Sequence, residues 1–218
     1  MSTQYSHFQT AFGFSECDLE EGGLDELLNQ FSLTMRSHSR RVAVSAAIMA
    51  EYAKESFHWI DAPTGMNLAV IAHLGGLCHD VGKLLMPALA TSDVDYMRHP
   101  VYGAELLERH KKALFSNEEE TGLVLEMVRY HHERPDGSGF PYGLRKRSIP
   151  LTAGICAVAD SLDHRIYSEP RLRDSGAAIF CDIKAQEGTL LYESAVDCFE
   201  QAWPRLMEQY ARWDRSAG

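Results

Sequence analysis

The sequence predicts an all-α protein, a helical bundle of about seven helices, and three observations support this prediction. Apolar residues recur near a 3.6-residue period along most of the chain. No segment alternates convincingly between apolar and polar residues, as a half-buried strand does. Glycine and proline gather between the periodic segments, where they end helices.

The first half of the chain is predicted to hold an arm and three helices. Residues 1–23 are interpreted as an N-terminal arm, either loosely held or a short helix, and residues 24–218 as the helical domain with its C-terminal extension. One long helix is expected from 24 to about 54. A second helix ends near residue 82, and its apolar face is predicted to be buried: Leu68, Ile71, Leu74 and Leu77. A third helix starts at Ser92 or Asp93 and ends at about 111.

The second half is predicted to hold four helices. A capping box that begins at Ser116 opens a helix that ends at about 130. Residues 134–143 contain three glycines and two prolines, which argue against a helix there. Residues 151–165 are expected to be helical. Two more helices are expected from about 175 to 213, with Pro204 as a kink or a boundary.

Charge and composition narrow the class of function. The 218 residues carry a net charge of −10, which argues against binding to polymeric nucleic acid or to an anionic membrane, because both require a basic surface. The uninterrupted apolar stretches fall short of the ~18 residues of a transmembrane helix, and no secretory signal is visible. The five cysteines are widely spaced without a C-x-x-C pair, which favours a reduced, cytoplasmic protein.

Two pairs of adjacent residues are candidates for metal chemistry. His79 and Asp80 end an apolar helix and can offer an imidazole and a carboxylate to one point, and the two oxygens of Asp80 can bridge two cations. A capping or surface pair is the alternative. His131 and His132 end another helix, where they either converge on one ion or form a solvated polar terminus.

The remaining candidates are single residues. Asp160 lies in an otherwise apolar helical segment, where a buried carboxylate is costly unless it is paired or metal-bound; an exposed position on the polar face is the alternative. His38 and His99 are weak signals by themselves, since a lone histidine is usually structural. Lys83 alone is most often a solvated lysine.

In combination, these residues resemble the HD-GYP family of the HD phosphohydrolase superfamily. The resemblance covers roughly residues 30–165 and rests on residues 38–42, 79–83, 99–103, 131–141, 149–150 and 158–160. The histidine doublet followed by an Asp-Gly-x-Gly-x-Pro loop is the most specific part of the match. A His-Asp pair alone indicates only the superfamily.

The resemblance implies a phosphodiesterase that hydrolyses cyclic di-GMP to pGpG or GMP with two divalent transition metals at the centre of the fold. Mixed imidazole and carboxylate donors favour iron or manganese, with zinc or nickel as alternatives. One ion is implied to take His38, His79, Asp80 and Asp160, and the other Asp80, His99, His131 and His132. Asp80 and Lys83 are the implied catalytic residues, and Lys83 faces a phosphate oxygen. The substrate mouth is implied to comprise Asp136, Gly137, Gly139, Phe140 and Pro141.

Three positions depart from the family pattern. Phe140 replaces the family's tyrosine, so its ring can pack but its hydroxyl is lost. Glu169 stands where a cation is expected; Arg171 or Arg173 is expected to supply the phosphate contact, or the segment is a solvated turn. Thr34, four residues before His38, stands where three-metal members carry a glutamate, so we expect two ions.

Two other readings of function stay open. One is a non-catalytic module that binds a nucleotide or a partner protein. The other is a phosphohydrolase of another nucleotide. Residues 134–147 carry a net charge of +3, which favours an anionic ligand near this loop, although a solvated basic loop is the alternative. A separate signalling protein is a further expected partner.

Overall fold

A computed structural model describes residues 16–56, 67–86, 96–115, 118–169 and 175–216. These residues form eight α-helices and two short 3-10 helices. The elements are, in order, α2 (Glu16–Asn29), α3 (Leu33–Ser56), α4 (Leu68–Cys78), η1 (Val81–Leu85), α7 (His99–Leu114), α8 (Glu118–Tyr130), η2 (Lys146–Ser148), α9 (Leu151–Ser168), α11 (Gly176–Lys184) and α12 (Glu193–Ser216). Within these ranges no strand forms, and the isolated bridge pairs Glu187 with Leu191. The all-α prediction is therefore confirmed.

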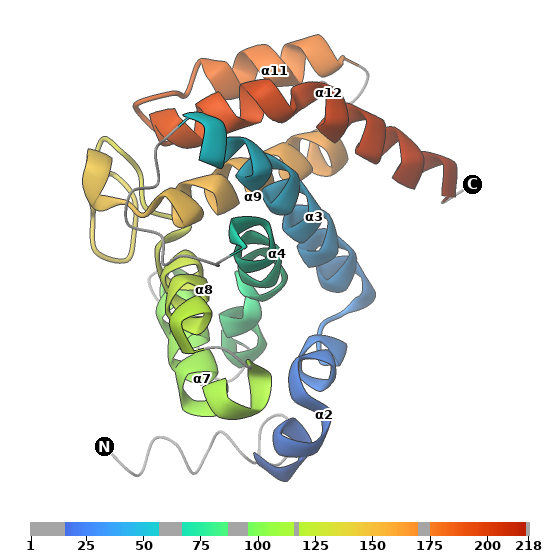
Figure 1. The fold of residues 1–218 in the computed structure, drawn as a ribbon, viewed down its shortest axis with the longest axis vertical. Coiled ribbons are helices and arrows are strands. Elements are labelled where there is room, and N and C mark those ends of the chain that lie inside the picture. Colours follow the sequence, from blue (N-terminus) through green and yellow to red (C-terminus); the bar gives the residue numbers. More distant parts are fainter. Residues whose placement is uncertain (1–15, 57–66, 87–95, 116–117, 170–174, 217–218) are drawn as a thin grey trace.

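Helix α4 lies at the centre of the bundle (Figure 1). It packs against α3, α8 and α9, while α7 and α8 lie side by side and α2 packs on α7. The C-terminal pair, α11 and α12, covers α9 and the adjoining part of α3. The elements that carry the predicted metal ligands therefore surround one central helix.

The bundle has two hydrophobic clusters that meet at α4. The first lies among α3, α9, α11 and α12 and includes Met49, Leu162 and Phe199. The second lies among α2, η1, α7 and α8 and includes Leu27 and Leu107. Because α4 contributes to both clusters, the residues that follow its C-terminus lie at their junction.

The single long helix predicted from 24 to 54 is wrong, since the chain breaks between α2 and α3. Ser32 caps α3: its hydroxyl accepts the backbone N–H of Met35 at 3.3 Å. Helix α2 passes through Gly23, which has a left-handed φ of +58°. Residues 1–15 of the predicted arm, and the predicted helix starts at Ser92, Asp93 and Ser116, lie outside the described residues.

The apolar face predicted for the second helix is only partly correct. Leu68 and Ile71 are buried, but Leu74 and Leu77 are half-buried. The central position of α4 explains the difference, because another side of the helix carries Gly75 and Gly76 against neighbouring helices, where a Cβ atom would collide with Met127 and with Ala43.

Two further features bear on the sequence predictions. Residues Leu68–Leu85 have the length and mean hydropathy, 1.3, of a membrane-spanning helix, and 61% of this stretch is buried inside the fold, as in the core helix of a globular protein. The chain after residue 175 forms two helices as predicted, and α12 continues through Pro204.

Candidate metal centre

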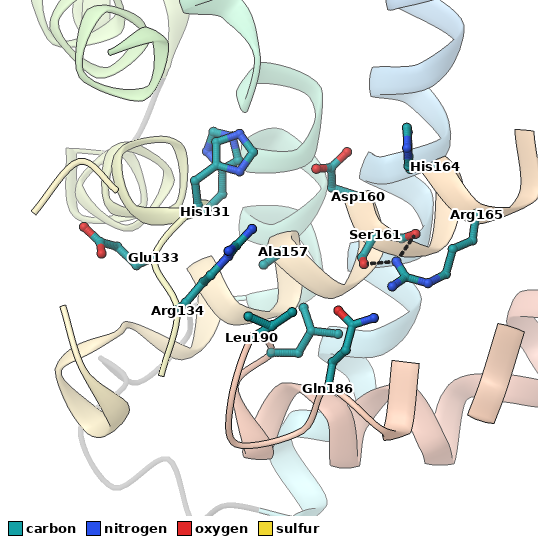
Figure 2. A pocket seen from close by; sticks show the side chains of 12 residues that line it. His131, Glu133, Arg134, Ala157, Asp160, Ser161, His164, Arg165, Gln186 and Leu190 are labelled. Carbon is teal, nitrogen blue, oxygen red and sulfur yellow. Dashed lines mark hydrogen bonds between the residues drawn. The ribbon is translucent and has the colours of Figure 1, made fainter. Parts of the chain in front are cut away.

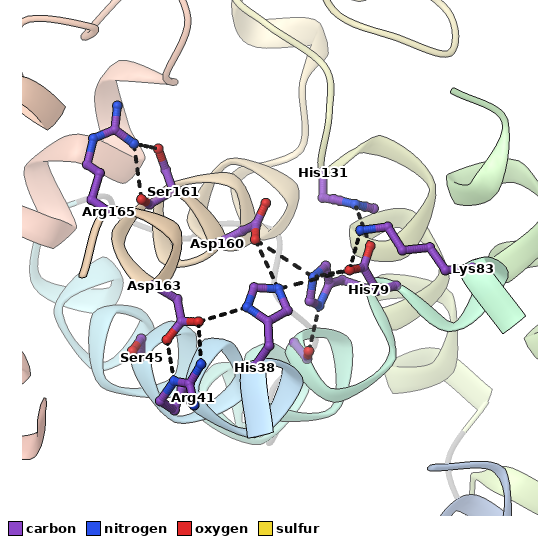
Figure 3. A network of polar contacts seen from close by, with 12 residues as sticks. His38, Arg41, Ser45, His79, Lys83, His131, Asp160, Ser161, Asp163 and Arg165 are labelled. Carbon is purple, nitrogen blue, oxygen red and sulfur yellow. Dashed lines mark hydrogen bonds and ion pairs between the residues drawn. The ribbon is translucent and has the colours of Figure 1, made fainter. Parts of the chain in front are cut away.

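The seven predicted ligands converge from five places in the fold, and Figure 3 shows His38, His79, His131 and Asp160 among them. The helices α3 and α9 supply one residue each, the end of α4 supplies two, the first residue of α7 supplies one, and the two residues after α8 complete the set. In that order they are His38, Asp160, His79, Asp80, His99, His131 and His132. No other protein segment needs to contribute for a cluster to form.

Asp80 divides these ligands into two groups. Its Oδ1 atom lies 3.3 Å from His99 Nε2 and 4.0 Å from His131 Nε2. Its Oδ2 atom lies 3.4 Å from His79 Nε2 and 4.0 Å from His38 Nε2. The two oxygens of one carboxylate therefore face two sets of imidazoles.

We call these sets the Oδ1 group and the Oδ2 group. The Oδ1 group is Asp80, His99, His131 and His132, whose donor atoms all lie within 4.8 Å of one another. The Oδ2 group is Asp80, His38 and His79, which meet the same distance limit, together with Asp160. Asp160 joins this group because its Oδ1 atom lies 3.2 Å from His38 Nε2 and 4.0 Å from His79 Nε2.

Three imidazoles are oriented by the backbone of their own segment. The Nδ1 atoms of His79, His99 and His131 lie 2.8, 2.9 and 2.8 Å from carbonyl oxygens three residues earlier. Because a carbonyl only accepts, each Nδ1 carries a proton, which leaves the Nε2 lone pair to bind either a second proton or a metal ion. The three lone pairs point into the cluster.

The chemistry of these donors fits a metal. The Nε2 atoms of His79, His99 and His131 and the Oδ1 atom of Asp80 are buried without a hydrogen-bond partner among the described residues. Leaving a buried polar atom unsatisfied costs about 1–3 kcal/mol. Four such atoms side by side are explained if they ligate cations, and neutral imidazole with carboxylate is a donor set that iron, manganese and zinc accept.

His38 is oriented by a side chain from α9. Its Nδ1 atom lies 2.8 Å from Asp163 Oδ2, and the same carboxylate accepts two hydrogen bonds from Arg41 at 2.6 and 2.9 Å and one from the Tyr210 hydroxyl at 3.1 Å. Metal-binding histidines are commonly held in this way by a carboxylate. The sequence analysis assigned no role to Asp163, Arg41 or Tyr210. The i, i+3 spacing of Asp163 from Asp160 was the available signal.

The two groups differ in their electrostatics. Burial alone would lower the pKa of His38, but hydrogen bonds and charge from Asp160 and Asp163 outweigh it and raise the pKa of His38 to about 9. In the Oδ1 group, burial and the neighbouring imidazoles hold the pKa of His131 well below its usual range. Burial, with the adjacent His99, lowers the pKa of His132 to about 3.

Asp80 is held as a carboxylate. Burial favours its neutral form, but His79, His99 and Lys83 together keep the pKa of Asp80 well below its usual value. Lys83 Nζ donates to Asp80 Oδ2 at 2.6 Å and lies 5.6 Å from the centre of the Tyr96 ring. The predicted phosphate-facing lysine therefore contacts the central carboxylate, and its side chain is 24% exposed.

A glycine brings Asp80 and His99 together. A Cβ atom on Gly82 would lie 1.9 Å from the carbonyl oxygen of His99 and 2.6 Å from the backbone nitrogen of Gly103. Only glycine permits this approach of η1 to the start of α7. Gly82, which belongs to the 79–83 motif, thus has a packing role.

The predicted mouth loop lies against His132. The Phe140 ring is centred 4.6 Å from the imidazole of His132, and the Phe140 N–H donates to the His132 carbonyl at 3.1 Å. A Cβ atom on Gly139 would lie 2.4 Å from the nitrogen of Arg134, so glycine is required for this contact. The bond from Phe140 to Pro141 is cis.

The rest of the loop is fixed by two carboxylates. Glu133, which is 3% exposed, accepts the backbone N–H groups of Tyr142 and Leu144 at 2.7 and 2.8 Å. Asp136 is exposed, and its Oδ1 accepts the N–H of Ser138 at 2.8 Å, so its visible contact stabilises a turn at Gly137, where φ is +81°. Glu133 was part of the quoted motif, but the sequence analysis gave it no role.

Four other positions were singled out from the sequence, and the two that the structure describes, Thr34 and Glu169, lie outside the cluster. Thr34 is exposed on α3 and belongs to neither group. Glu169 follows α9 directly. Arg171 and Arg173 lie outside the described residues.

A cavity of about 220 Å³ lies along α9 and borders both groups, through Asp160 of the Oδ2 group and through His131 and His132 of the Oδ1 group (Figure 2). Its walls come from α9, from the residues after α8 and from the segment after α11: His131, His132, Glu133, Arg134, Ala157, Asp160, Ser161, His164, Arg165, Gln186, Leu190 and Leu191. The last six of these were not singled out from the sequence. The signal at His164 was its position one helical turn after Asp160.

Comparisons with known proteins match this chain to a family model and to curated relatives. The family model described as HD domain matches residues 35–165. A protein of Thermotoga maritima named cyclic di-GMP phosphodiesterase is 33% identical over 147 residues, which cover 62% of this chain and 38% of that protein. The cyclic di-GMP phosphodiesterase response regulator RpfG of Xanthomonas campestris is 34% identical over 140 residues, 58% of this chain and 35% of that protein.

A third relative is named for a different substrate. The 3'3'-cGAMP-specific phosphodiesterase 2 of Vibrio cholerae is 30% identical over 163 residues, which cover 63% of this chain and 30% of that protein. The chain thus spans about a third of the length of these curated relatives.

Proposed function

This chain belongs to the HD domain family, and from that premise we propose that it is a metal-dependent phosphodiesterase whose substrate is the cyclic dinucleotide cyclic di-GMP. The observation that carries the proposal is the division of the cluster by Asp80. One carboxylate faces two groups of imidazoles through its two oxygens, and four buried donor atoms around it have no hydrogen-bond partner among the described residues. A structural cluster of histidines has no need of such an arrangement.

We assign one ion to each group, so that Asp80 bridges two ions and Thr34 takes no part. Two divalent cations bound there would supply an activated water at neutral pH and offset the negative charge that develops on the phosphoryl oxygens. Iron or manganese suits the mixed donors best, with zinc and nickel as alternatives.

The chain's own residues orient the metal-binding imidazoles and offset the negative charge of the substrate. Asp163 and the backbone carbonyls hold the imidazoles so that their Nε2 lone pairs face the centre. Lys83 lies beside Asp80 and places a positive charge next to the position of an anionic phosphodiester. The mouth is assigned to the loop that contacts His132, through Asp136, Gly137, Gly139, Phe140 and Pro141.

The names of the relatives support a cyclic dinucleotide as the substrate. They leave open whether its second base is guanine, as in cyclic di-GMP, or adenine, as in 3'3'-cGAMP. Relatives named for cyclic di-GMP and for 3'3'-cGAMP both match this chain at 30–34% identity. The direct experiment is therefore a turnover panel with cyclic di-GMP, 3'3'-cGAMP and cyclic di-AMP, in protein supplied with manganese or iron. Preferred cleavage of cyclic di-GMP supports the proposal, and preferred cleavage of cGAMP reassigns the substrate within the same chemistry.

The non-catalytic module is the competing proposal. It predicts that cyclic di-GMP binds but that no linear product forms in any metal. The same panel, read by chromatography of the products, separates the two. Regulation by a separate signalling protein and a cytoplasmic location stay predictions of the sequence.

A further inference from the structure

The cavity beside α9 has a wall that metal ligation does not use. At one end lie Asp160 and the histidines after α8; at the other end lies the segment after α11, with Gln186, Leu190 and Leu191. Its volume of about 220 Å³ is below the ~300–1,000 Å³ of pockets that enclose a whole drug-sized ligand. A cavity of this size has room for one ring system next to the metal centre but not for a whole dinucleotide.

The amide of Gln186 has a fixed orientation. Its Nε2 atom donates to Asp182 Oδ2 at 3.1 Å. A carboxylate only accepts, so the amide cannot be turned around without losing this bond. The carbonyl oxygen of Gln186 is left as an acceptor, and Figure 2 shows it on the side of Leu190, while the nitrogen lies on the side of Arg165.

Asp182 is itself anchored to α9. Arg165 donates from Nε to the same Asp182 oxygen and from Nη1 to the backbone carbonyl and hydroxyl of Ser161. Gln186 is therefore connected through Asp182 and Arg165 to α9, the helix that carries Asp160. The carbonyl oxygen of Gln186 is held in place before any ligand arrives.

The other polar wall offers donors. Arg134 lines the cavity from the loop after α8, and its side chain makes no ion pair within the described residues. An arginine pairs with the O6 and N7 acceptors of guanine, while the guanine N2 amino group needs an acceptor. Adenine presents an amino donor at the position of O6, which an arginine cannot satisfy.

We propose that this cavity binds the base of the nucleotide whose phosphate lies at the metal centre, that the base is guanine, and that Gln186 is a specificity-determining residue. The carbonyl oxygen of Gln186 accepts from the guanine amino group, and Leu190 and Leu191 contact the ring. This inference rests on the proposed function for the position of the phosphate.

The test is the binding of single nucleotides, which are not cleaved. The parent protein and Gln186→Leu, each supplied with manganese, are titrated with 5'-GMP and with 5'-AMP by calorimetry. The substitution leaves the turn after α11 intact, because that turn uses the backbone carbonyl of Gln186 and not its side chain. Gln30→Leu, at an exposed position in the turn directly after α2, is the matched control.

We expect the parent to prefer GMP. In Gln186→Leu, GMP affinity falls about tenfold because one hydrogen bond to the half-buried Gln186 is lost, and AMP affinity stays within about twofold. Equal binding of GMP and AMP by the parent, no binding of either, or an equal loss for both nucleotides in the variant overturns the inference. Turnover of bis(p-nitrophenyl) phosphate, which has no base, tests the phosphodiesterase function separately, so either proposal can fail alone.

Discussion

The Oδ1 and Oδ2 groups share Asp80, yet the chain builds them in different ways. In the Oδ1 group, His99 and His131 are fully buried and are oriented by carbonyls only three residues away. In the Oδ2 group, His38 and Asp160 are 23% and 27% exposed, and His38 is oriented by Asp163, 125 residues away in sequence. His99 and His131 are oriented locally, at helix ends, whereas the orientation of His38 depends on the packing of α3 on α9.

This difference has consequences for how each group responds to change. The Oδ1 group is expected to keep its geometry as long as α7 and α8 are folded. The Oδ2 group is expected to depend in addition on a network of side chains that joins α3, α9 and α12. Four substitutions or conditions test this comparison, from the largest expected effect to the smallest.

Removal of Asp80 is expected to disable both groups. Asp80→Ala deletes the carboxylate that faces both sets of imidazoles and leaves two cations to repel each other. We expect turnover to fall by on the order of 10³-fold or more, with loss of at least one ion. Metal analysis and turnover of the purified variant measure this, and Asp25→Ala, exposed on α2, is the control. Wild-type turnover at equal metal content would contradict the mechanism.

Asp163→Asn is expected to weaken only the Oδ2 group. The change removes a charged acceptor from His38 and from Arg41 while keeping the shape of the side chain. Loss of such a supporting carboxylate lowers metal affinity by about 10–100-fold. Titration with manganese should show one ion bound as in the parent and one bound more weakly.

A second variant, Tyr210→Phe, provides a comparison in the same manganese titration. Tyr210→Phe removes a single hydrogen bond from the other oxygen of Asp163 and should cause a smaller loss of affinity. An equal loss at both ions in Asp163→Asn would show that the two groups are not independent.

A change of pH is expected to act on the Oδ2 group in metal-free protein. The pKa of His38 is raised to about 9 from an ordinary value of 6.5, so the folded state binds this proton more tightly than the unfolded state. The resulting stability is fully present below about pH 6.5 and is lost as the pH rises through about 9. The loss is on the order of 3 kcal/mol at most, because a tenfold change in proton affinity corresponds to 1.4 kcal/mol.

Chemical denaturation at pH 6 and pH 9.5 with a chelator present measures this loss. In the folded state His131 and His132 have lowered pKa values and bind no proton in this window, but the unfolded chain releases their protons near pH 6.5, so these two residues raise stability there, opposite in sign to His38. His38→Gln should therefore remove the loss of stability as the pH rises through about 9, whereas an unchanged loss would assign it to another residue.

The smallest expected effect belongs to the loop beside the Oδ1 group. Phe140→Leu removes the ring that lies 4.6 Å from His132, and such aromatic contacts contribute about 0.5–1.5 kcal/mol. We expect thermal unfolding to shift by only a few degrees, since ~1 kcal/mol corresponds to about 2–4 °C in a chain of this length. Phe140→Tyr keeps the ring and should unfold as the parent does. A shift equal to that of the leucine variant would show that the ring contact is not what matters.

The sequence predicted the fold class and the residues that lie together in the cluster better than it predicted what orients them. Apolar periodicity indicated the all-α fold, and the resemblance of short motifs to one family indicated the cluster residues. The break between α2 and α3 was missed because apolar periodicity continues across it, and only the Ser32 cap marks it. The pairing of Asp163 with Arg41 spans 122 residues, and no local pattern determines which helices will pack together.

Glu133 has a consequence for the entropy of substrate binding. A single buried carboxylate accepts the N–H groups of Tyr142 and Leu144 and so closes residues 133–144 into a ring anchored beside His132. The conformational entropy of closing that loop is lost when the protein folds, not when a ligand arrives. The proposed mouth is therefore preorganised, and a ligand that fits it would lose only its own freedom on binding.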